Sequence, residues 1–168
     1  MEKEKILKAL KKGMKGEMDS INLYQQAADK AEEGDEVADF FLERVEEEKT
    51  HYNYLLKFYK AIKDDKNIKN ISKDFPSVEE EKSPIISDEF YKRIGQKQYL
   101  FSAISTAALL ELESIKHYEK WASLSKEKEL KTFYKKLADW EREHYEEVLE
   151  IEKEAEKEYW IKNRFTPF

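Results

Sequence analysis

The sequence predicts an all-α fold, a four-helix bundle of two related antiparallel helical hairpins joined by a long crossover. Four long segments carry apolar residues at helical spacing, only four glycines and three prolines occur, and the two halves of the chain are similar in sequence. A hydrophobic share of 40%, with 13% aromatic residues, is enough to fill a core although another 40% of the residues are charged. The chain is therefore expected to form one domain over residues 1–168.

Two apolar stripes predict the first hairpin over residues 4–62, with helices at about 4–33 and 36–62. Gly34 and Asp35 supply the stop and the cap between the two helices. The first stripe comprises Ile6, Leu10, Met14, Glu17, Ile21, Tyr24 and Ala28, and the second comprises Phe41, Val45, Glu48, Tyr52, Leu55 and Ile62.

A long connection and a second hairpin follow. Residues 63–97 hold two of the three prolines and lack a sustained period, which predicts a crossover with a short helix at 88–94. This crossover is long enough to run the length of a bundle of about 40 Å. The second hairpin is predicted over residues 98–158, with helices at about 98–125 and 127–158, and residues 159–168 form an aromatic tail.

An internal repeat relates the two hairpins. The segment Glu17–Tyr24 matches Glu111–Tyr118 in Glu, Ser, Ile and Tyr at an offset of 94 residues. The second and fourth helices match at an offset of 93 residues, which pairs Phe40 with Phe133, Glu48 with Glu141, His51 with His144, Tyr52 with Tyr145 and Leu56 with Leu149. We therefore interpret the chain as a duplicated hairpin.

Composition argues against several classes of function. The sequence has no cysteine, which excludes a disulfide framework, a cysteine-based zinc site, an iron–sulfur cluster and a thiol nucleophile within it. A net charge of −6 leaves no basic surplus to neutralise phosphate, so no nucleic-acid partner is expected. The longest nearly uncharged stretch, residues 99–112, is too short to span a bilayer, and no signal-peptide core precedes it. We expect a cytoplasmic protein with no membrane partner.

Two Glu-x-x-His pairs mark the second and fourth predicted helices: Glu48/His51 and Glu141/His144. Residues three apart share a helix face, so each pair can direct a carboxylate and an imidazole to one point. At 1.5 Å per residue, the single acids Glu17 and Glu111 reach nearly the same height as these pairs, about 18–24 Å from the hairpin turns. Because an unpaired carboxylate on an apolar stripe is costly to bury, four glutamates and two histidines at mid-bundle indicate a site for divalent cations.

This ligand pattern resembles that of the ferritin-like di-metal carboxylate bundles. The chain resembles the rubrerythrin-like branch of that superfamily over both hairpins. The resemblance implies two iron ions, with Glu48 and Glu141 as bridges, although Mn or Zn would accept the same donors. It also implies that Tyr24 and Tyr118, two turns beyond the single acids, lie against the metal site as hydrogen-bond donors. The implied ligands are Glu17, Glu48, His51, Glu111, Glu141 and His144.

Two departures from the family pattern affect the expected function. Full-length rubrerythrins resemble this chain plus a rubredoxin domain whose four cysteines hold another iron. With none here, electrons would come from a separate donor, such as a rubredoxin-type protein. Many rubrerythrins also carry a further Glu three residues after the third-helix ligand, where this chain has Ser114, mirrored by Ser20. This departure argues against the family's redox-linked iron movement and against a fast peroxidase cycle.

Three functions remain open at this point. The favoured one is an oxidoreductase that reduces hydrogen peroxide or dioxygen with electrons from the external donor. The others are iron handling, as a ferroxidase or store, and a metal-binding structural module without redox turnover. Among rival site residues, Glu113 lies about 200° around the helix from Glu111, and His117 lacks a Glu three residues before it. In the run of residues 46–48, we expect Glu46 and Glu47 to be solvated.

The uncharged stretch from residue 99 presents large apolar groups all round its helix, which requires a second covering surface. A second subunit is the favoured cover. The tail, with Trp160, Phe165 and Phe168, and the crossover residues Ile85 and Ile86 are the alternatives within the chain. We therefore expect a homodimer, and the long crossover would permit hairpins to be exchanged between its chains.

Overall fold

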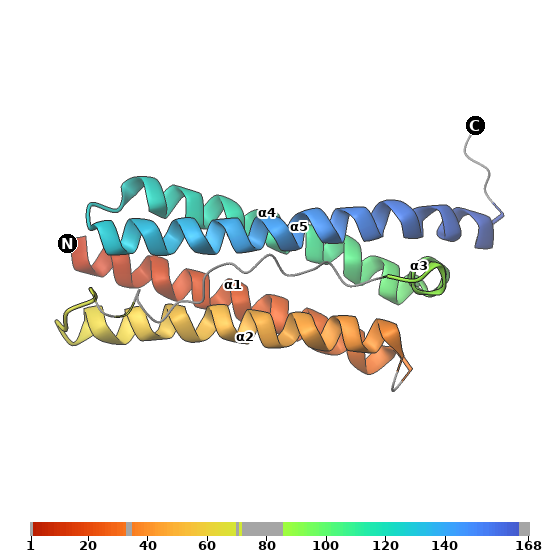
Figure 1. Ribbon diagram of the computed structural model, residues 1–168, viewed down its shortest axis with the longest axis horizontal. Helices are drawn as coiled ribbons and strands as arrows, with labels where there is room; N and C mark the ends of the chain where they lie inside the picture. Colours follow the sequence, from red (N-terminus) through yellow and green to blue (C-terminus); the bar gives the residue numbers. More distant parts are fainter. Residues whose placement is uncertain (1, 33–34, 70, 72–85, 165–168) are drawn as a thin grey trace.

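The computed structural model describes residues 2–32, 35–69, 71 and 86–164 and confirms the predicted all-α bundle. Within these residues, four long helices run side by side and one short helix lies at an end of the bundle (Figure 1). The helices are α1 (Glu2–Lys30), α2 (Glu36–Lys63), α3 (Asp88–Gln96), α4 (Gln98–Leu124) and α5 (Lys128–Lys162).

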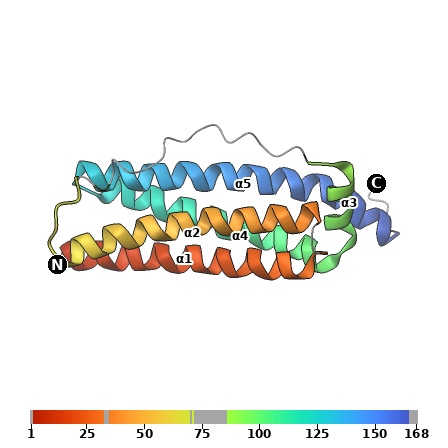
Figure 2. The same ribbon diagram turned by 60° about the horizontal axis from the view of Figure 1, so that its bottom comes forward.

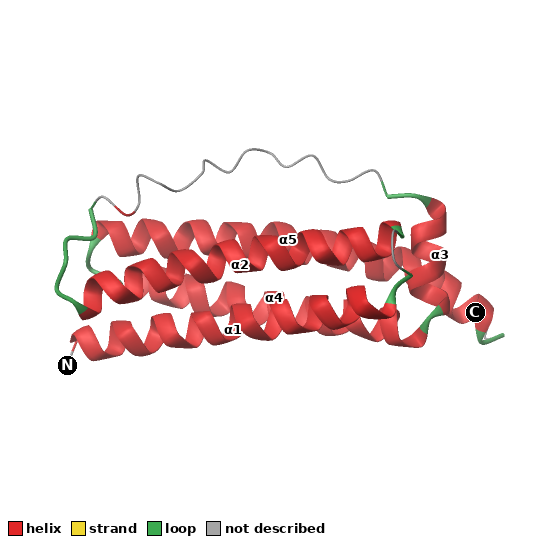
Figure 3. Cartoon of the chain, turned by 90° about the horizontal axis from the view of Figure 1, so that it is seen from below, coloured by secondary structure: helices red, strands yellow, loops and turns green. Residues whose placement is uncertain are grey.

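The long helices form two antiparallel pairs, as the repeat predicts. Helix α1 packs along α2, α4 packs along α5, and α1 also contacts α4. Figure 2 shows α3 crossing the end of the bundle, where it contacts α5 and α4. In Figure 3 the same four long helices are seen with α2 beside α5 and α1 beside α4. Side chains of α2 and α5 face one another across the bundle, as in the contact of Glu48 with His144.

The helix ends follow local capping signals. Asp35 caps α2 as predicted, and its carboxylate accepts a hydrogen bond of 3.2 Å from the backbone N–H of Val37. Ser87 caps α3 in the same way, accepting a bond of 3.1 Å from the N–H of Phe90. Helix α1 ends at Lys30 rather than at residue 33. Gly34 and residues 72–85 of the predicted crossover lie outside the described residues.

Two apolar clusters fill the bundle on either side of its middle. One cluster lies toward α3 and includes Phe41, Phe90 and Ile104. The other lies toward the opposite end and includes Phe58 and Phe133, whose rings stack with centroids 4.1 Å apart. The six predicted site residues come from the four long helices. In each helix they lie between the positions that contribute to one cluster and those that contribute to the other. The polar site is thus enclosed by apolar packing at both ends.

The apolar surface of α4 is covered in large part by its own chain. Leu100 and Ile104 are buried beneath α3 and α5, and the ring of Phe101 stacks on Tyr159 at 4.8 Å. This contact involves the last turns of α5, which continues to Lys162, so the start of the predicted tail is helical. Leu109 stays 65% exposed, and the expected homodimer remains a prediction. Despite its uncharged start, neither α4 nor any other helix in the described parts of the chain could span a membrane.

Gly95 allows α3 to approach α5 closely. A Cβ atom at this position would lie 2.6 Å from Cβ of Glu158 and would also collide with the backbone carbonyl of Ala155. We expect Gly95→Ala to lower the free energy of unfolding by about 1–3 kcal/mol, the usual cost of overpacking. Gly16→Ala is the matched control, because its Cβ would meet only Oγ of Ser114, at 3.5 Å.

In urea unfolding, Gly16→Ala should be neutral or stabilising by up to about 1 kcal/mol, since Ala is the better helix former. Equal effects from the two substitutions would contradict the close α3–α5 packing.

Candidate metal centre

The predicted site residues meet in the middle of the bundle, one group from each long helix. Each is at most 6% exposed, although all carry ionisable side chains. Helix α1 contributes one glutamate, α4 contributes one, and α2 and α5 each contribute a Glu-x-x-His pair. The residues are Glu17, Glu48, His51, Glu111, Glu141 and His144.

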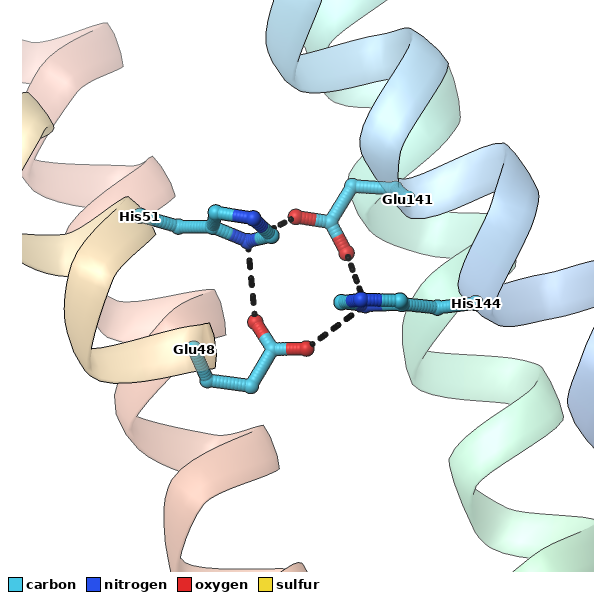
Figure 4. Close-up of side chains that lie close together, drawn as sticks. All are labelled: Glu48, His51, Glu141 and His144. Carbon is cyan, nitrogen blue, oxygen red and sulfur yellow. Dashed lines mark hydrogen bonds and ion pairs between the residues drawn. The ribbon is translucent and has the colours of Figure 1, made fainter. Parts of the chain in front are cut away.

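The two Glu-x-x-His pairs form the centre of this group (Figure 4). Each of the four side chains offers one ligand atom, and these atoms lie within 4.8 Å of one another. Nδ1 of His51 lies 3.3 Å from Oε2 of Glu48 and 3.0 Å from Oε1 of Glu141. Nδ1 of His144 lies 3.0 Å from the other oxygen of Glu48 and 3.9 Å from the other oxygen of Glu141. Both carboxylates therefore span the two histidines.

The single glutamates are held by hydrogen bonds that cross between the hairpins. The hydroxyl of Tyr24 in α1 donates to Oε1 of Glu111 in α4, at 2.5 Å. The hydroxyl of Tyr118 in α4 donates to Oε1 of Glu17 in α1. Gly13 makes room for Tyr118, because a Cβ atom there would lie 3.1 Å from its ring. Each tyrosine therefore donates a hydrogen bond to an acid of the other hairpin.

Several buried polar atoms of the site make no hydrogen bond of good geometry. They are Oε2 of Glu48, Nδ1 of His51, Oε2 of Glu111 and Oε1 of Glu141. Atoms of this kind are rare in folded proteins unless a ligand or ion satisfies them. Carboxylate oxygens and imidazole nitrogens are donors that Fe, Mn and Zn accept. The residues present therefore fit a metal centre.

Burial and crowding shift the protonation equilibria of the site. Desolvation, reinforced by the charge of Glu48, raises the pKa of Glu17 to about 8, and desolvation also raises the pKa of Glu111 and Glu141. Desolvation opposes ionisation of Glu48 too, but its hydrogen bond with His144 and its close contact with His51 hold its pKa well below the ordinary value. Burial likewise opposes the charged form of His144, yet contacts with Glu47 and Glu48 raise its pKa to about 10. In the absence of a bound cation, protons on side chains such as Glu17 and His144 therefore balance part of the negative charge of the site.

The structure also places the rival residues of the sequence. Glu113 is exposed, which agrees with the choice of Glu111. His117 lies outside the cluster, with Nε2 3.0 Å from the carbonyl oxygen of Ala9. The expectation that Glu47 is solvated is wrong: its side chain is only 18% exposed, and Oε2 lies 3.2 Å from Nε2 of His144. Glu46 is exposed as expected, and its carboxylate binds Lys49.

Arg44 and Trp140 also border the site, and sequence reasoning passed over both. Arg44 is 4% exposed and pairs with Glu47 at 2.9 Å. Trp140 stacks on His51 with ring centroids 5.1 Å apart. A signal for Arg44 was available, because it lies one helical turn before Glu48 on the buried face. The repeat pairs Glu47 with Trp140, but this mismatch gives no sign that either side chain contacts the site.

Comparison with known proteins agrees with the site. The family model described as Rubrerythrin matches residues 8–152, which include both hairpins and all six predicted ligands. Searches of curated proteins and of solved structures find no significant match. Because the family model spans most of the chain, and the buried Glu and His side chains form a group suited to metal binding, this chain belongs to the rubrerythrin family.

Proposed function

We propose that this chain is a non-haem di-iron carboxylate oxidoreductase that reduces hydrogen peroxide or dioxygen in the cytoplasm. The observation that carries the proposal is the convergence of four buried glutamates and two buried histidines, four of whose buried polar atoms lack a hydrogen bond. The family match supports iron as the metal. A separate protein of the rubredoxin type would supply the electrons, because this sequence has no cysteine to hold a further, rubredoxin-type iron.

The ligand set suits two divalent cations. Four ionised carboxylates carry four negative charges, which balance two divalent ions, and two imidazoles add neutral donors. Oε2 of Glu17 lies 3.6 Å from Nδ1 of His51, and Glu111 is buried in α4 with its Oε1 hydrogen-bonded by Tyr24. Glu48 and Glu141 reach both histidines, so they are the proposed bridges.

When bound, two iron ions that alternate between ferrous and ferric states would supply the electron pair for cleaving a peroxide O–O bond. The chain's own residues would orient and insulate that reaction. The hydroxyl groups of Tyr24 and Tyr118 donate hydrogen bonds to Glu111 and Glu17 and so hold these two carboxylates in place. The two apolar clusters limit the entry of water from both ends of the bundle. Reduction of one peroxide to two waters consumes two electrons and two protons, and both must be replaced from outside the site.

Iron handling and a structural metal module are the alternative functions. A ferroxidase or store would need a large assembly, whereas the oxidoreductase is compatible with the expected homodimer. Sedimentation equilibrium separates these sizes. A dimer with exchanged hairpins would be revealed by mixing a chain that carries Glu48→Ala with one that carries Glu141→Ala, because co-refolding would then regenerate some intact sites.

Removal of a proposed bridge should lower the metal content. We expect protein purified without added metal to contain iron, and Glu48→Ala and Glu141→Ala each to lose roughly half or more of it, since each carboxylate spans both histidines. Elemental analysis with anomalous scattering measures both content and position. Glu46→Ala is the control, because that acid is exposed and paired with Lys49. Equal losses in all three variants would mean nonspecific binding by the acidic surface.

Metal binding should stabilise the fold more as pH rises. Glu17 and His144 bind protons more tightly in the folded chain, with pKa values of about 8 and about 10 against ordinary values of 4.5 and 6.5. The resulting stabilisation is complete below those ordinary values and is lost as pH rises through the folded values. The metal-free protein should therefore lose stability between about pH 5 and pH 10.

A bound cation replaces these protons, so the difference in Tm between Mn²⁺-loaded and chelator-treated protein should widen by several degrees between pH 6 and pH 8.5. Calorimetry measures both forms. A difference that is independent of pH would contradict the protonation states described above.

Peroxide consumption tests the reaction itself. Iron-loaded, reduced protein should consume one peroxide per reduced centre in a single anaerobic turnover. Stopped-flow absorbance monitors this reaction. The Glu46→Ala variant should behave like the parent chain, and Glu141→Ala should lose most of the amplitude. A fully iron-loaded protein that leaves peroxide intact would favour the structural-module alternative over the oxidoreductase.

A further inference from the structure

The six site residues obey the internal repeat, but their neighbours do not. At the offset of 93 residues that pairs the two histidines, Glu47 corresponds to Trp140. At the same offset Arg44 corresponds to Leu137, and Tyr54 corresponds to Glu147. The side chains behind the two histidines therefore differ in chemical character although the ligands match.

His144 is backed by a row of charged side chains. Its Nδ1 faces Glu48 in the centre, and its outer nitrogen, Nε2, lies 3.2 Å from the carboxylate of Glu47. Nη1 of Arg44 lies 2.9 Å from that carboxylate and 3.3 Å from the carboxylate of Glu147 in α5. Arg44 is itself buried and lies over the ring of Phe40. Glu47 is thus held between a fixed cation and the outer nitrogen of His144.

His51 is backed by aromatic rings instead. The indole of Trp140 is parallel to the imidazole to within 1°, with centroids 5.1 Å apart. The ring of Tyr54 in turn stacks on Trp140, with centroids 6.1 Å apart, and Nζ of Lys57 lies 5.2 Å from the centre of the Tyr54 ring. Such stacking fixes the plane of a ring but places no negative charge on its outer nitrogen.

We propose that Glu47, held in place by Arg44, is a positioning residue for His144 and makes the two cation positions of the centre unequal. The proposal rests on the proposed metal site but not on its redox reaction. A carboxylate at the outer nitrogen of a histidine keeps the proton there, turns the inner nitrogen toward the metal and makes that nitrogen a stronger donor. The cation position served by His144 is therefore the tighter one, and the position served by His51 is the weaker one.

Cobalt titration tests the inequality. In anaerobic titrations followed by visible absorbance and calorimetry, the parent chain should bind Co²⁺ in two resolved steps. Glu47→Gln should weaken the tighter step about tenfold or more and leave the weaker step unchanged, as loss of such an outer partner usually does. Glu46→Gln removes the same charge from the adjacent exposed position and should leave both steps unchanged. Glu47→Asp keeps the charge and should fall between the parent and Glu47→Gln.

A second measurement reports on the histidine itself. In Zn²⁺-loaded protein with ¹⁵N-labelled histidine, the Nε2 proton of His144 should be protected from exchange, and Glu47→Gln should remove that protection while His51 is unaffected. Trp140→Phe keeps a ring on His51 and should not change the His144 signal. Equal weakening of both Co²⁺ steps, or unchanged binding and exchange in Glu47→Gln, would overturn the proposal. A parent chain that binds no Co²⁺ would overturn the metal site as well, whereas normal Co²⁺ binding without peroxide reduction would overturn only the redox function.

Discussion

Burial of four carboxylates and two imidazoles at one point is the constraint on which the rest of this structure depends. Charged groups in an apolar interior are strongly unfavourable unless they are paired, hydrogen-bonded or bound to a cation. Here the groups come from four different helices, so the register of every long helix must place its acid at the same height. The apolar clusters on either side fix that register by packing.

Close approach between helices is the second requirement, because the site is assembled by contacts rather than by loops. The absence of a side chain at Gly13 lets the ring of Tyr118 lie against α1, and from there its hydroxyl reaches Glu17. At the far end, Gly95 brings α3 against α5, whose last turns cover the apolar start of α4. Small residues thus determine where the bundle is tight, and the acids lie between these points.

Much of this arrangement could be predicted from sequence, because helical periodicity and the internal repeat can both be recognised without knowing how the helices pack. The two Glu-x-x-His pairs and the single acids Glu17 and Glu111 follow from spacing along one helix face. Glu47 could not be placed in this way. It adjoins Glu48 in sequence but faces sideways, and only the position of α5 decides whether such a side chain meets water or His144. The helical extension past residue 158 was also missed, because the stacking of Tyr159 on Phe101 is a long-range contact.

The reciprocal tyrosine–glutamate hydrogen bonds have a consequence for the evolutionary origin of the chain. A pair of identical hairpins related by a two-fold axis would make both bonds with a single tyrosine and a single glutamate per hairpin, each reaching across to its partner. The bonds from Tyr24 to Glu111 and from Tyr118 to Glu17 preserve that symmetry within one chain. An ancestral hairpin could therefore have built the whole ligand set as a self-paired dimer before gene duplication and fusion. Only after duplication could one copy of a position become Glu47 and the other become Trp140, because a symmetric ancestor had to place the same residue at both.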